Sequence, residues 1–69
     1  MDKKEIINKL GRTLRDFGYA NLTDEEVDKS VGQAIKDEAE GNIIAMFIKG
    51  WLDDELASVK PDIERLWAE

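Results

Sequence analysis

The chain has 69 residues, with 16 acidic and 10 basic side chains, a formal net charge of −6, and neither cysteine nor histidine. So short a chain has room for one domain, residues 1–69, and the missing residue types exclude disulfides, thiolate or imidazole metal sites and the most common general base. The negative charge opposes binding to nucleic acid or to anionic lipid, and no segment has the roughly 18 apolar residues of a membrane span or the apolar core of a secretory signal. We therefore expect a cytoplasmic protein that uses no cofactor.

The first predicted helix covers about 3–17. Asp2 is placed to cap its start, because an Asp side chain at this position accepts a hydrogen bond from a free backbone N–H. Gly18 is a typical residue for its end, since glycine readily takes the left-handed conformation that closes many helices. Apolar residues recur at helical spacing along one side and predict the buried seam, which consists of Ile7, Leu10, Leu14 and Phe17 with Ile6 beside it.

The second predicted helix covers about 24–39. Thr23 and Glu26 have the spacing of a capping box, in which the two side chains bond to each other's backbone N–H groups. The predicted buried stripe is thin and consists of Val27, Val31, Ala34 and Ile35. The end of this helix is less clearly marked. Gly41 and Asn42 suit a stop followed by a new start, and the alternative is one long helix that continues through Gly41.

The third predicted helix covers about 43–58 and is the most apolar part of the chain. Its first six residues, 43–48, are all apolar and could also form a buried strand. The continuation favours a helix, because the apolar positions then share one face, formed by Ile44, Ile48, Trp51 and Leu52. Pro61 is expected to end this helix by forcing Lys60 out of helical geometry.

A short fourth helix is predicted at about 61–67, because Pro61 suits a first helical turn and Ile63, Leu66 and Trp67 follow at helical spacing. The predicted fold is therefore all-α, a small bundle of three helices with a short C-terminal helix.

The third helix has more apolar surface than two neighbouring helices can cover, which predicts an interface. Its surplus face carries Ile43, Met46 and Phe47, and methionine adapts well to such surfaces. Tryptophan is enriched at binding hot spots, so Trp51 and Trp67 are candidates too, although each could instead belong to the core. The predicted partner-binding set is Ile43, Met46, Phe47, Trp51 and Trp67, with Asp53 and Asp54 as an acidic rim. A small core also favours self-association, so we expect a homodimer.

No motif in the chain predicts catalysis or metal binding. Residues 22–28 resemble the entry helix of an EF-hand, but the twelve-residue loop would then place Lys36 and Phe47 at its first and last ligand positions, and neither can coordinate calcium. The acidic runs at 24–28 and 53–55 project in divergent directions from a helix, which favours a solvated face over a site. We expect no enzyme activity.

Two functions remain. The first is a small acidic interaction module, a regulator or adaptor that binds a protein through the third helix. The alternative is an acidic decoy that mimics nucleic acid and blocks the cationic groove of a nucleic-acid-binding protein. Salt discriminates between them, because charge mimicry weakens steeply between about 50 and 200 mM salt while apolar docking persists.

Overall fold

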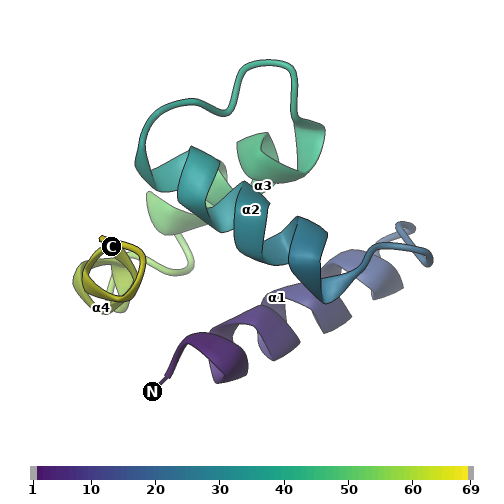
Figure 1. Ribbon diagram of the computed structural model, residues 1–69, viewed down its shortest axis with the longest axis horizontal. Coiled ribbons are helices and arrows are strands. Elements are labelled where there is room, and N and C mark those ends of the chain that lie inside the picture. Colours follow the sequence, from purple (N-terminus) through teal and green to yellow (C-terminus); the bar gives the residue numbers. More distant parts are fainter. Residues whose placement is uncertain (1, 69) are drawn as a thin grey trace.

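The computed structural model describes residues 2–68 and is all-helical, as predicted (Figure 1). Its four helices pack into a particle of 28 × 25 × 23 Å. Within the described residues there is no strand, which excludes the strand alternative for residues 43–48. The helices are α1 (Lys3–Asp16), α2 (Asp24–Ile35), α3 (Ile43–Leu52) and α4 (Lys60–Leu66).

α1 begins and ends as its capping residues indicate. The Asp2 carboxylate accepts a hydrogen bond of 2.8 Å from the backbone N–H of Glu5. At the other end Gly18 takes a φ of +134°, and the backbone N–H groups of Gly18 and Tyr19 donate to the carbonyls of Arg15 and Leu14. These paired bonds are a Schellman cap, which turns the chain sharply away from the helix axis.

α2 starts at the predicted capping box, in which Thr23 and Glu26 bond to each other's backbone N–H groups. Its predicted end near residue 39 was wrong, because the helix stops at Ile35. Asp37 adopts a left-handed φ of +58°, and the N–H of Glu38 donates to the Gln33 carbonyl at 2.8 Å. This is again a Schellman cap, closed here by an aspartate, one of the few non-glycine residues that tolerate this conformation.

Residues 36–42, between α2 and α3, are not helical, so the alternative of one continuous helix through Gly41 is excluded. Ala39 is buried, and a turn with Gly41 at a φ of +85° brings Asn42 back toward α2. Asn42 then caps α3, as predicted, because its side-chain oxygen accepts from the N–H groups of Ile44 and Ala45.

α3 is shorter than the predicted 43–58, because it ends at Leu52 and residues 53–59 form consecutive turns. The N–H groups of Asp53 and Asp54 donate to the carbonyls three residues earlier, which tightens the last turn. Three consecutive acids at the negative end of the helix dipole also disfavour continuation. Turning there lets Leu56 pack against the core from outside the helix.

α4 carries Pro61 in its first turn, as predicted, although Lys60 is itself helical. The expectation that Pro61 ends the preceding helix was therefore wrong, since α3 stops well before the proline. Trp67 follows directly after α4 and is 7% exposed. Figure 1 shows α4 at the left of the molecule, and the contacts of Trp67 with Asp28 and Lys3 place this C-terminal end beside α2 and the start of α1.

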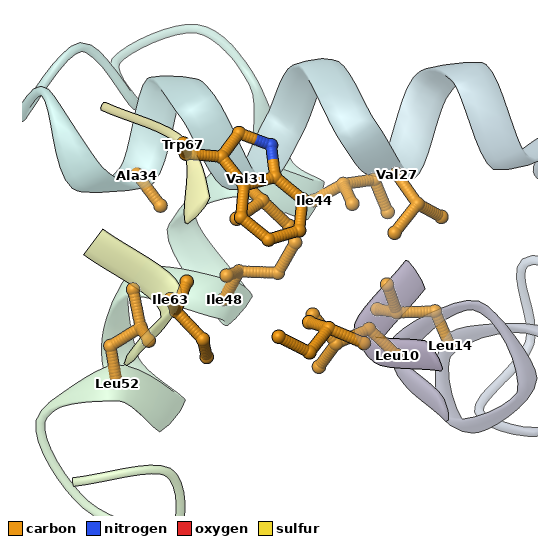
Figure 2. Packing of buried hydrophobic residues seen from close by; sticks show 11 residues of the cluster. Leu10, Leu14, Val27, Val31, Ala34, Ile44, Ile48, Leu52, Ile63 and Trp67 are labelled. Carbon is orange, nitrogen blue, oxygen red and sulfur yellow. The ribbon is translucent and has the colours of Figure 1, made fainter. Parts of the chain in front are cut away.

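The core lies where the four helices meet, and Figure 2 shows side chains from all of them directed into one space. One prediction about its edge was wrong. Phe17 does not belong to the buried seam, because it stands at the α1 C-cap and is 65% exposed. Trp51 is half-buried and packs against the core cluster, while Ala45 and Ile48 are the fully buried residues of α3. The core cluster consists of Ile6, Leu10, Leu14, Val27, Val31, Ala34, Ile44, Ile48, Leu52, Ile63 and Trp67.

Across residues 2–68, no helix is both long enough and apolar enough to cross a membrane.

Candidate functional site

A row of aromatic side chains crosses the surface where the end of α1 meets α3. The ring centroids of Phe17 and Phe47 are 5.5 Å apart, and Tyr19 and Trp51 each lie 6.2 Å from Phe47. The first two pairs are edge-to-face, a favourable geometry for aromatic rings. Phe47 is therefore the centre of a cluster built from two segments that are far apart in the sequence.

The α1 cap creates this cluster. Phe17 is the C-cap residue, and the left-handed Gly18 reverses the chain so that Tyr19 comes back against the same ring. Arg15 fixes the reversal by donating from Nε to the Leu22 carbonyl at 2.8 Å. The aromatic row thus depends on a helix end rather than on the periodicity of any helix.

Apolar side chains of α3 extend the row into a larger exposed surface. Ile43 and Met46 are each 57% exposed, and with Phe17 they are the three large hydrophobic side chains of residues 2–68 that are mostly in water. Scattered exposed hydrophobics are ordinary, whereas a contiguous group marks an interaction surface. We call this group the apolar patch. It consists of Phe17, Tyr19, Ile43, Met46, Phe47 and Trp51.

A hollow of about 760 Å³ borders the patch between α3 and the segment that follows α2. Met46 and Gly50 lie on its α3 side, and Gly50 leaves open space because nothing lies within 4 Å of the position a Cβ would take. The remaining wall is largely polar and contains three carboxylates and one ammonium group. These wall residues are Asp37, Ala39, Glu40, Gly41, Lys49 and Asp53.

The predicted acidic residues lie near the patch but differ in their partners. Asp53 lines the hollow and forms an ion pair with Lys60 at 3.2 Å. Asp54 is exposed in the turn after α3. Lys49 forms an ion pair with Asp37, and that hydrogen bond holds the pKa of Asp37 below its ordinary value of 3.8 and raises the pKa of Lys49 above 10.5.

Trp67 lies apart from these residues. Its Nε1 donates to the Asp28 side chain at 2.8 Å, and the Lys3 ammonium lies 4.9 Å from the ring centroid. The indole belongs to the buried core cluster. We therefore place Trp67 in the core and leave it out of the patch.

Phe17 and Tyr19 are patch residues that periodicity did not suggest. Phe17 continues the spacing of the α1 seam, so its register predicts burial. The cap signal at Gly18 does mark the place where the seam ends, but it does not indicate that Phe17 and Tyr19 meet Phe47.

Over residues 2–68, no three carboxylates gather in a way that could hold a metal ion. What this surface offers is apolar area next to negative charge.

No protein-family model, curated protein or solved structure matches the chain.

Proposed function

We propose that this protein is a non-enzymatic interaction module, a regulator or adaptor that binds another protein through the apolar patch. The observation that carries the proposal is the exposure of Phe17, which packs edge-to-face on Phe47, together with that of Ile43 and Met46 on the outer face of α3. The contact of such a surface with water is unfavourable. A partner that covers it gains about 25 cal/mol of hydrophobic free energy for each Å² of apolar area buried.

Self-association through the same patch is part of this proposal. A chain of this size has a small core, and covering exposed apolar area with a second copy stabilises both copies. The expected dimer is weak, because each chain carries a formal charge of −6 and like charges repel.

The test replaces exposed side chains only. Ile43→Gln combined with Met46→Gln removes two apolar side chains without altering the net charge or any core residue. Phe47→Asp is a less specific test, because Phe47 also packs against the core. A tagged chain and this double variant are used to capture partners from host lysate at about 50 and 200 mM salt, the range in which charge-driven binding collapses. The matched control is Glu5→Gln with Lys9→Gln, two exposed positions on α1 that also leave the net charge unchanged.

Apolar docking predicts one stoichiometric partner that survives the higher salt and is lost only with the patch variant. Analytical ultracentrifugation of the same proteins should show that the weak dimer is lost with the same variant. Capture and self-association that both survive the patch variant would contradict the proposal.

The competing proposal is the acidic decoy. It predicts binding that disappears at the higher salt and is indifferent to the patch variant. The ion pairs weaken its support, since a mimic of nucleic acid needs free carboxylates and several here are neutralised by lysine or arginine. The paired carboxylates are those of Asp24, Asp28, Asp37, Asp53 and Asp62.

A further inference from the structure

Gly50 lies inside α3, where almost any other residue except proline would favour the helix more than glycine does. It lies one turn after Met46 on the exposed side of the helix, and a Cβ there would meet open space. Glycine weakens a helix by roughly 0.5–1 kcal/mol relative to alanine, and no contact within the chain requires it here. A small residue on an exposed helix face lets another backbone approach closely.

The charges around this position have one dominant sign. The hollow beside Gly50 contains Asp37, Glu40 and Asp53 against a single basic side chain, Lys49. Asp37 is bonded to Lys49 and Asp53 to Lys60, which leaves Glu40 as the remaining carboxylate of the wall. Glu40 is exposed at the rim. A ligand that entered this hollow would therefore meet a negative potential on one side and the apolar patch on the other.

A second copy of the chain fits this arrangement poorly. In a two-fold dimer the same surface appears on both sides, so the interface would contain the rim carboxylates of both copies. Lys49 could not form ion pairs with these carboxylates without breaking its ion pair with Asp37. Charge complementarity instead favours a partner that brings its own positive charges.

We propose that the hollow and the apolar patch together bind a basic amphipathic helix of a partner protein, which crosses α3 at Gly50. This inference rests on the proposed function and names the partner's chemistry. The apolar side of the helix covers Met46 and Phe47, with anchors at the spacing i, i+3, i+4 and i+7. Lysine or arginine side chains on its flank reach Glu40, where charge also speeds the encounter.

The test uses three labelled helical peptides of about 18 residues, five turns each, with the same apolar stripe and with Lys, Gln or Glu along both flanks. None contains an aromatic residue, and binding to the full chain is followed by fluorescence anisotropy of the label. We expect saturable binding of the lysine peptide, binding at least about tenfold weaker for the glutamine peptide, and none for the glutamate peptide.

Two pairs of variants locate the binding. Glu40→Lys and Glu5→Lys change the net charge equally, but only Glu40 lines the hollow. We expect Glu40→Lys to weaken binding by about tenfold and Glu5→Lys by less than about twofold. Gly50→Leu should also weaken binding by about tenfold or more, because its side chain occupies the crossing point, whereas Gly50→Ala should have a smaller effect. Leucine favours a helix over glycine, so this loss would not reflect unfolding.

The outcomes separate this inference from the proposed function. Equal binding of the lysine and glutamine peptides, lost with the Ile43→Gln, Met46→Gln variant, would retain apolar docking and overturn the basic partner. Equal losses with Glu40→Lys and Glu5→Lys would mean that the attraction comes from the net charge alone, which would overturn the site. Full binding by Gly50→Leu would overturn the crossing point, and a dimer tighter than any peptide complex would make a second copy the occupant.

Discussion

Asn42 joins two helices through a single side chain. Its oxygen accepts from the N–H groups of Ile44 and Ala45, while its amide nitrogen donates to Ser30 Oγ at 3.1 Å and Gln33 Oε1 at 2.6 Å. Ser30 is 2% exposed, so its hydroxyl depends on such a partner. One residue thus caps α3 and fastens it to α2.

We expect Asn42→Ala to lower the free energy of unfolding by about 2 kcal/mol, since it removes a helix cap and leaves a buried hydroxyl without its partner. Asn42→Asp retains the capping oxygen but has no amide to donate, so its loss should be intermediate. Urea unfolding followed by circular dichroism measures both. A loss below about 0.5 kcal/mol for Asn42→Ala would contradict the role of this residue, because that is the lower limit for a helix cap.

The ion pair of Asp37 and Lys49 gives a pH dependence with a definite sign. The lowered pKa of Asp37 contributes stability above its ordinary value of 3.8, and this contribution is lost as the pH falls through the lowered pKa. The ionised Lys49 contributes stability at pH values below 10.5, and this contribution is lost as the pH rises through its raised pKa. The pair should therefore stabilise the fold only between these limits.

Asp37→Asn tests this window, because asparagine tolerates the left-handed backbone but carries no charge. The stability difference between the wild type and this variant should be largest near neutral pH and shrink at both extremes. Because both groups are exposed, the difference should also diminish in high salt. A difference that grows below pH 3.8 would contradict the assignment.

At the scale of the helices, the glycines differ in what they contribute. Gly50→Ala should stabilise the protein by roughly 0.5–1 kcal/mol, because the added methyl group meets open space and favours the helix. Gly41→Ala is the matched comparison and should destabilise it, since φ at this position is +85°. Thermal and urea unfolding of the two variants should therefore shift in opposite directions, and a destabilised Gly50→Ala would contradict the open environment.

Helix starts were predictable from the sequence, whereas helix ends were less so. Asp2, Thr23 and Asn42 each cap the start that their position indicates, because an N-cap depends on a local hydrogen bond from one side chain. The ends of α2 and α3 were placed too late. A left-handed aspartate carries no distinctive sequence signal, and the turns after Leu52 depend on where Leu56 packs in three dimensions.

For the whole molecule, Trp67 is the residue that closes the core. It contacts α2 through the hydrogen bond to Asp28 and lies beside Lys3 of α1. Trp67→Ala should lower the free energy of unfolding by about 3–5 kcal/mol, the usual loss when a large buried aromatic side chain is truncated. Such a loss is a large part of the stability of a domain this small.

Trp67→Phe is the control, because it retains most of the ring volume but cannot donate to Asp28. Its loss should be clearly smaller than that of Trp67→Ala in the same urea titration. Equal losses would assign the contribution to the hydrogen bond rather than to packing.

The candidate surface was predictable only in part. The register of α3 correctly placed Ile43 and Met46 outside the core, because one helix face follows directly from the spacing of its residues. The contributions of Phe17 and Tyr19 depend on how α1 ends against α3, and that contact joins segments separated by the whole of α2. No local pattern encodes such a meeting.

The two tryptophans occupy environments that a spectroscopist can separate. Trp67 is sealed in the core and should emit at short wavelength and resist quenching by iodide, while half-buried Trp51 beside Phe47 should emit further to the red and be quenched. Unfolding should change both signals, whereas a ligand on the apolar patch should protect Trp51 alone. The molecule therefore carries one intrinsic reporter for its folding and another for the occupancy of its surface.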